Sequence, residues 1–274
     1  MKLHEDKEAF KKLINIVSIY YNYDQAIIEK DYYVMYILEE IVKQYSDIVF
    51  KGGTSLSKAH KLTKRFSEDI DLTLETHPGD SKRKRIKHIL VDLIKKLNFE
   101  IANEDSIKGN RDFNRYLINY PKLVKGSGIK EVVQIETSYI IPGYPKEEKE
   151  VSSYIYEYLK DHNLDEEINK YDMHSFKVNV QTVERTFIDK VFAICDYKIS
   201  NEIKEHSRHI YDLYKIYPLI KKDDSLLSLI KDIREKRSKH EKCYSAKDGE
   251  DINKHLKEIV VYLKTMERKK AQPR

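Results

Sequence analysis

The sequence predicts an α/β (α+β) fold, in which a mixed sheet lies between N-terminal helices and a helical C-terminal lobe. Helical and strand-like periods alternate up to about residue 140, which favours a sheet covered by helices rather than a β-sandwich. Beyond the turn at 142–145 the spacing of apolar residues is mainly helical. We therefore expect two parts: residues 1–145, with the N-terminal helices and the sheet core, and residues 146–274, a mainly helical lobe that completes a cleft.

Two helices are expected first. Phe10, Leu13 and Val17 recur at helical spacing, and Asp24 is a suitable N-cap for a second helix that runs to Ile41. The pattern then changes to a short apolar run at 48–50, which predicts a buried strand that ends at a tight glycine turn.

A short helix at 54–62 follows, and then a strand from Asp69 with strict alternation of polar and apolar residues. Asp80 is expected to cap a helix whose apolar face runs from Ile86 to Leu97. The remaining elements are expected as strands and then helices, over 113–120, 131–140, 176–180, 182–197, 205–217, 224–236 and 251–270.

Composition excludes several classes of protein. No apolar run approaches the roughly 18 residues of a membrane span, and the N-terminus has no signal-peptide core. Two cysteines exclude a disulfide scaffold and a cysteine-based zinc cluster, and we expect Cys195 to be a core residue. The net charge of 51 − 46 = +5 is compatible with nucleic-acid binding. A cytoplasmic protein is expected.

The first chemical signal is the segment Gly52-Gly53-Thr54-Ser55 between a strand and a helix. Paired glycines let the backbone approach a phosphate closely, and backbone N–H groups and the two hydroxyls can then face the anion. A pair of glycines alone is more often only a turn, so this segment points to a phosphate site only together with the acidic residues after it.

Asp69 and Asp71 stand two residues apart on the predicted strand, so both carboxylates project from one face while Ile70 and Leu72 point to the core. Two close carboxylates repel each other unless a cation lies between them, and hard oxygen ligands suit Mg²⁺. A phosphate-binding turn beside such a pair is what nucleotidyl transfer requires, with two metal ions that activate the attacking hydroxyl and neutralise the leaving pyrophosphate.

The pattern of Gly-Gly-Thr-x-Leu-Ser followed by Phe-Ser-Glu-Asp-Ile-Asp-Leu resembles the AbiEii/AbiGii branch of the nucleotidyltransferases, which includes MenT-like toxins of bacterial toxin–antitoxin systems. Three more segments resemble that family in the same order. They are 28–33, where Glu29-Lys30-Asp31 is followed by two tyrosines, and 183–190 and 206–213. Val183 replaces the usual proline of the family. The resemblance implies a nucleotidyltransferase fold, metal binding by Asp69 and Asp71, contact of Lys190 with the triphosphate, and Asp212 as a further essential acid.

A third carboxylate is common in this superfamily, and the alternation in 131–140 places Glu136 on the polar face of its strand. We take Glu136 as the candidate third acid, either as general base or as part of the metal site. An ordinary solvent-facing glutamate is the alternative.

The basic run that includes Lys82, Arg83, Lys84 and Arg85 opens a helix against the helix dipole. We hypothesise that it contacts a nucleic-acid backbone, and a merely solvated face is the alternative. The resemblance implies NTP as substrate, the 3′ end of tRNA as acceptor, blocked translation with growth arrest or phage defence, and a cognate antitoxin. The rival functions are nucleotidyl transfer onto a protein side chain and a non-catalytic nucleotide- or RNA-binding module.

Overall fold

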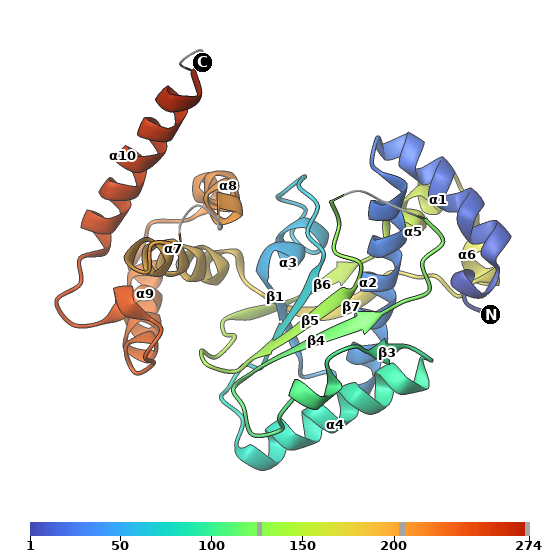
Figure 1. Cartoon of the computed structure of the whole chain (residues 1–274), viewed down its shortest axis with the longest axis horizontal. Coiled ribbons are helices and arrows are strands. Elements are labelled where there is room, and N and C mark those ends of the chain that lie inside the picture. Colours follow the sequence, from blue (N-terminus) through green and yellow to red (C-terminus); the bar gives the residue numbers. More distant parts are fainter. Residues whose placement is uncertain (125–127, 203–206, 272–274) are drawn as a thin grey trace. The chain divides into compact units, whose positions relative to one another are not determined.

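The computed structural model describes residues 1–124, 128–202 and 207–271, and it divides into two compact units, Met1–Thr182 and Val183–Arg274. The expected mixed sheet, with helices before and after it along the chain, is confirmed (Figure 1). The division follows residue 182 rather than residue 145, because the chain after 145 returns to the sheet and adds two strands to its edge.

The sheet of the first unit has seven strands in the order β3-β4-β5-β2-β1-β7-β6. The central pairs β2–β5 and β1–β7 are parallel, and the other four pairs are antiparallel. The strands are β1 (Val49–Lys51), β2 (Asp69–Thr73), β3 (Glu100–Ile101), β4 (Phe113–Asn119), β5 (Val133–Ser138), β6 (Lys146–Val151) and β7 (Phe176–Gln181).

Helices cover the apolar face of the central strands. Ile70 and Leu72 of β2 pack in one core with residues of α2 and α4, such as Leu38 and Leu90. Helix α2 packs against α1, α4 and α5, and α6 packs against α5 (Figure 1). The helices of this unit are η1 (Leu3–Glu5), α1 (Lys7–Tyr21), α2 (Gln25–Gln44), α3 (Gly52–Lys58), α4 (Asp80–Lys96), η2 (Glu104–Ser106), α5 (Tyr154–Asp161) and α6 (Asp165–Lys170).

Helix termini follow local chemistry with one exception. The carboxylate of Asp24 accepts a hydrogen bond from the N–H of Ala26 at 2.8 Å, so the expected N-cap of α2 is confirmed. The expected cap at Asp80 is wrong. Gly79 is the N-cap of α4, and Asp80 is its first residue, where its negative charge still complements the helix dipole.

The second unit is entirely helical within its described residues. Helix α7 packs against α8, α9, η5 and α10, and Cys195 is fully buried in a small core with Ile194 and Ile259, as expected. Its elements are α7 (Val183–Ile199), α8 (Ser207–Ile216), η4 (Tyr217–Leu219), α9 (Asp224–Ser238), η5 (Tyr244–Ala246) and α10 (Ile252–Ala271).

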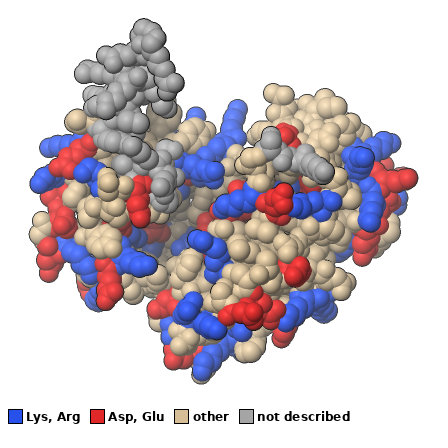
Figure 2. Space-filling view, in the orientation of Figure 1, with Lys and Arg blue, Asp and Glu red and all other residues tan. Residues whose placement is uncertain are grey.

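Two surface properties bear on function. Figure 2 shows that basic and acidic side chains are intermixed over the face in view, so the modest positive net charge does not form one continuous basic field there. Among the described residues, none of the helices is both long and apolar enough to span a bilayer.

Candidate active site

The glycine turn connects β1 directly to α3. Gly52 has a φ of +81°, and a Cβ atom there would lie 2.0 Å from Oδ2 of Asp71. A Cβ atom at Gly53 would lie 2.4 Å from Nη2 of Arg65 and 2.9 Å from Oγ of Ser67. Gly52 is therefore required by its positive φ and by the close carboxylate of Asp71, whereas a side chain at Gly53 would displace the end of the flexible Arg65 side chain.

The hydroxyls of Thr54 and Ser55 are buried and bonded within the turn. Thr54 Oγ1 donates to Ser67 Oγ at 3.0 Å, and Ser55 Oγ donates to the carbonyl of Gly52 at 3.0 Å. In this structure they stabilise the turn against the segment that precedes β2.

The acidic pair lies on β2, between β1 and β5. Asp69 and Asp71 are both half-exposed on one face of the strand, while Ile70 and Leu72 are fully buried on the other. The two aspartates therefore share a face, as the alternation predicts. Their partial exposure leaves them open to solvent.

Charged residues from four neighbouring strands form one row across the sheet. Asp71 is in register with Lys51 of β1 and with Glu136 of β5, and Glu136 is in register with Arg115 of β4. Oε1 of Glu136 accepts hydrogen bonds from Arg115 Nε at 2.9 Å and from Gln134 Nε2 at 2.8 Å. Glu136 is thus a neighbour of the acidic pair in the sheet, with its carboxylate held by two donors.

The acidic pair offers an open set of ligands to a metal ion. Among the described residues, no three His, Cys, Asp or Glu side chains converge to enclose a metal, so Glu136 does not join Asp69 and Asp71 in a closed site. Two carboxylates on an open face nevertheless fit Mg²⁺, which keeps several waters and takes further ligands from substrate phosphates.

Cationic side chains lie beside the acidic pair and beside the glycine turn. Nζ of Lys130 lies 3.1 Å from Oδ1 and 3.4 Å from Oδ2 of Asp69, and Arg65 lies against Gly53. Lys51, Arg65 and Lys130 were not among the residues predicted from the sequence. The sequence offers only position as a clue to two of them: Lys51 directly precedes Gly52, and Arg65 directly precedes the Phe-Ser-Glu-Asp segment.

Helix α2 supports the site through consecutive buried charges. Lys30 is fully buried and donates to Oε2 of Glu68 at 2.5 Å and to the carbonyl of Lys130 at 2.7 Å. Lys30 therefore links Glu68, which directly precedes Asp69, to Lys130, whose ammonium group binds Asp69. Burial lowers the pKa of Lys30, and the adjacent Glu68 opposes that shift.

The flanking acids of the same motif anchor two other segments. Glu29 accepts hydrogen bonds from the N–H groups of Leu123 at 2.5 Å and Val124 at 3.2 Å. Asp31 binds Nζ of Lys58 at 2.6 Å and accepts from the N–H of Tyr154 at 2.7 Å. Burial raises the pKa of both carboxyl groups, and these bonds offset part of that desolvation.

In the second unit the two predicted residues form a buried ion pair. Nζ of Lys190 on α7 lies 2.7 Å from Oδ2 of Asp212 on α8, with side chains 5% and 0% exposed. Nζ of Lys190 also lies 3.3 Å from Nδ1 of His209, whose ring stacks on Tyr197. Neither residue has the solvated position that an average lysine or helical aspartate would take.

The predicted nucleic-acid contacts lie on the first turns of α4. Lys82, Lys84 and Arg85 are exposed, whereas Arg83 is half-buried and forms ion pairs with Asp80 and Asp112. Three of these four side chains are therefore presented to solvent, and the fourth is held within the fold.

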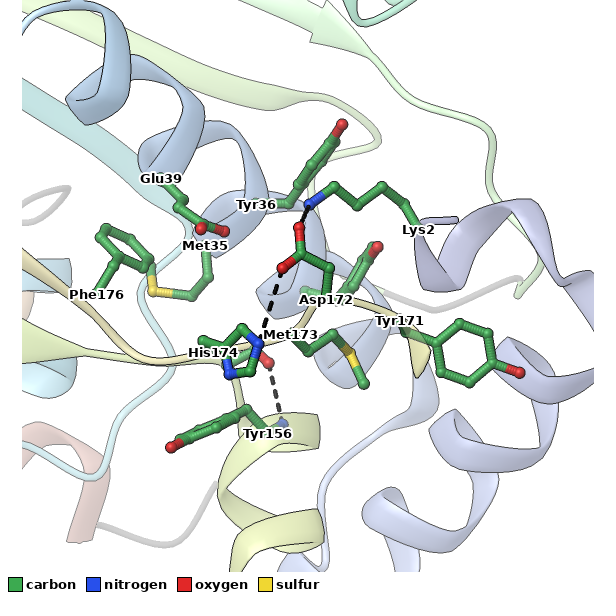
Figure 3. Close-up of a pocket in the computed structure, with 12 residues that line it drawn as sticks. Lys2, Met35, Tyr36, Glu39, Tyr156, Tyr171, Asp172, Met173, His174 and Phe176 are labelled. Carbon is green, nitrogen blue, oxygen red and sulfur yellow. Dashed lines mark hydrogen bonds and ion pairs between the residues drawn. The ribbon is translucent and has the colours of Figure 1, made fainter. Parts of the chain in front are cut away.

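Two pockets of the first unit differ in their relation to this site. One, of about 30 Å³, is lined by residues such as Lys2, Asp172 and His174 (Figure 3). Neither Asp69 nor Asp71 lines this pocket, and it has room for only one or two water molecules. The other, of about 460 Å³, is lined by Lys130 and by residues such as Tyr120 and Ile129, so it adjoins the ion pair with Asp69.

A comparison of the sequence with models of known protein families identifies the family of this chain. The family model of the AbiEii nucleotidyl transferase toxins, which act in type IV toxin–antitoxin systems, matches residues 36–272. The chain belongs to this family. The match includes the glycine turn, the acidic pair, Lys190 and Asp212, and it begins after the buried Glu29-Lys30-Asp31 motif of this AbiEii protein.

Similar solved structures include two bacterial proteins. MenT4, a nucleotidyltransferase toxin from Mycobacterium tuberculosis H37Rv, has 17% identity and a TM-score of 0.43, over 66% of this chain and 59% of that toxin. The AbiEii chain thus spans about three fifths of the length of MenT4. JHP933 from Helicobacter pylori has 18% identity and a TM-score of 0.42, over 88% and 93% of the two chains. A comparison with curated proteins finds no match.

Proposed function

We propose that this toxin-family nucleotidyltransferase is Mg²⁺-dependent and moves a nucleoside monophosphate from an NTP to an acceptor hydroxyl at the 3′ end of a tRNA. The observation that carries the reaction is the position of Asp71, beside Asp69 on one strand face and against the backbone of Gly52. This arrangement supports a site where metal-binding oxygens and a phosphate-binding turn lie next to each other.

Asp69 and Asp71 would hold Mg²⁺, which when bound supplies positive charge to the triphosphate and to the acceptor hydroxyl. Lys130 already occupies Asp69, so an incoming cation would compete with this ammonium group. Once displaced, Lys130 is close enough to the acidic pair to bind a phosphate oxygen instead. Arg65, next to Gly53, would provide a second cationic contact for the triphosphate.

Lys190 is proposed as a further contact for the triphosphate. The carboxylate of Asp212 lies 2.7 Å from Nζ of Lys190 and pairs with it in a buried position. Asp212 would therefore act through Lys190 by holding its ammonium group in one position. Glu136 is proposed as the third acid, with Arg115 and Gln134 fixing its carboxylate beside Asp71.

The test is a transfer assay with the purified full chain, total tRNA and each of the four α-³²P-labelled NTPs, with Mg²⁺ or with EDTA. We expect label in tRNA that RNase removes and protease does not, with pyrophosphate released in equal amount and no label in EDTA. Label that resists RNase would instead indicate modification of a protein, and no pyrophosphate with any NTP would indicate a non-catalytic binding module.

A matched pair of variants tests the site. Asp71→Asn removes one carboxylate charge from the acidic pair and should lower the rate of nucleotide transfer about 10²-fold or more. Asp92→Asn makes the same change at an exposed position of α4 and should leave transfer unchanged. Because the family acts in toxin–antitoxin systems, expression of the wild type without its antitoxin should arrest growth, and Asp71→Asn should relieve that arrest.

A further inference from the structure

One segment of the second unit combines exposed aromatic rings with positive charge. It runs from Arg208 on α8 to Lys222 after η4, and the structure describes all of it. Tyr214 is 74% exposed and Tyr217 is 50% exposed, although large apolar surfaces are normally covered in proteins. We refer to Arg208, Tyr214, Lys215, Tyr217, Lys221 and Lys222 as the α8–η4 patch.

Lysine ammonium groups lie over the tyrosine rings of this patch. Nζ of Lys215 is 5.6 Å from the centroid of Tyr214, and Nζ of Lys222 is 4.3 Å from that of Tyr217. Lys222 also donates to the hydroxyl of Tyr217 at 2.7 Å. Such cation–π contacts hold the rings at the surface with positive charge beside their faces.

The segment from Arg208 to Lys222 exposes no negative charge. Its only carboxylate is Asp212, which is fully buried and paired with Lys190. Two exposed carboxylates, Asp223 and Asp224, follow directly after Lys222, and Asp223 caps α9 by accepting from the N–H of Leu226 at 3.0 Å.

This combination fits a polyanion with accessible flat rings. Nucleobases stack on tyrosine whatever their identity, and lysine and arginine neutralise the phosphates between them. Protein–protein interfaces are also rich in tyrosine, but lysine is depleted there, whereas this patch carries three lysines. The chemistry therefore favours RNA with unpaired bases over a protein partner.

We propose that the α8–η4 patch binds a single-stranded part of the acceptor RNA by stacking bases on Tyr214 and Tyr217. The proposal rests on the proposed function in one respect, that the acceptor is RNA. The patch shares helix α8 with Asp212, which lies buried against Lys190 on that helix. Tyr214 follows Asp212 by two residues, about 200° around the helix, so α8 would stack a base on Tyr214 on one side and hold Lys190 through Asp212 on the other, with Arg208 and Lys215 nearer the side of Asp212.

The experiment measures RNA binding without NTP, by fluorescence anisotropy of a labelled single-stranded RNA of about 12 nucleotides, which lies within the usual site size. A blunt RNA duplex of equal length is the second probe. Tyr214→Ala/Tyr217→Ala should weaken single-strand binding about tenfold or more and duplex binding far less. Lys215→Ala/Lys222→Ala should reduce the log–log salt slope by about 1.4, from about 0.7 for each lost phosphate contact.

Tyr244→Ala and Lys231→Ala are the controls, since both side chains are exposed on the second unit outside the patch. They should bind RNA like the wild type, and circular dichroism with thermal unfolding checks that every variant folds. Unchanged single-strand affinity in the tyrosine variant, or equal loss for single strand and duplex, would overturn the proposal.

The same experiment separates the two proposals. Asp71→Asn should bind the single-stranded RNA with wild-type affinity while it transfers no nucleotide. If the wild type transfers no nucleotide but the patch variants still lose RNA binding, the proposed reaction fails and the RNA surface stands. Full transfer to tRNA together with unchanged RNA affinity in the patch variants would support the reaction and refute the surface.

Discussion

The contact between Gly52 and Asp71 allows a sharp test of the site by one methyl group. In Gly52→Ala the new Cβ would lie 2.0 Å from Oδ2 of Asp71, a distance that non-bonded atoms do not tolerate. Either the turn or the carboxylate must move by more than 1 Å, because ordinary contacts begin at about 3.4 Å. The carboxylate pair that we propose as metal ligands is then no longer in its original position.

Gly52→Ala combines two effects, backbone strain from its positive φ and the collision with Asp71, and a control variant, Gly249→Ala, separates them. A non-glycine residue with positive φ costs about 1–2 kcal/mol of folding free energy. Gly249 has a φ of +84°, and a Cβ atom there would meet no other atom within 4 Å, so Gly249→Ala carries the backbone strain without the collision. A misplacement of about 1 Å near reacting atoms can cost 10²-fold in rate, or about 2.7 kcal/mol of transition-state stabilisation.

The assay compares pyrophosphate release and urea unfolding for the wild type and both variants. We expect Gly249→Ala to lose about 1–2 kcal/mol of unfolding free energy, Gly52→Ala to lose at least as much, and only Gly52→Ala to lose about 10²-fold in transfer rate. Equal transfer rates in the two variants would refute the argument, since the contact with Asp71 would then have no part in the reaction.

Two further predictions concern buried groups. Lys30→Met leaves the carboxylate of Glu68 without its ammonium partner and should cost about 3–5 kcal/mol of unfolding free energy, measured by urea denaturation. The control Lys11→Met, at an exposed position, should change that free energy by less than about 0.5 kcal/mol. A cost below about 1 kcal/mol for Lys30→Met, on the order of a surface ion pair, would contradict a structural role for Lys30. Burial raises the pKa of the Cys195 thiol to about 12 and raises that of Cys243, so at mildly alkaline pH both stay protonated and a thiol reagent should label them only after denaturation. Rapid labelling of the folded protein would show that this core is open.

The central part of the fold was accessible from the sequence because its signals are local. Alternation fixes the faces of β2, and a carboxylate at the N-cap marks the start of α2, so each prediction needed only a few neighbouring residues. The same holds for the shared face of Asp69 and Asp71. Their function as metal ligands, and the roles of Lys190, Asp212 and Glu136, stay predictions that the proposed assays test.

Long-range contacts were not accessible in this way. Strand β6 has the sequence Lys-Glu-Glu-Lys-Glu-Val, which carries little strand propensity and is a strand because it pairs with β7 at the edge of the sheet. This pairing also places the division of the chain after residue 182. Likewise, Lys30 and Glu68 are 38 residues apart, and nothing in the spacing shows that their charges are buried together.

The charged row across β1, β2, β5 and β4 has a consequence for synthesis of the protein. Lys51 and Asp71 leave the ribosome well before Arg115 and Glu136, and the parallel pairing of β2 with β5 waits for the whole intervening segment. Pairings between distant segments form slowly, because the loop between them must close first. The nascent chain of this protein therefore lacks the complete row until about half of its length has emerged and folded.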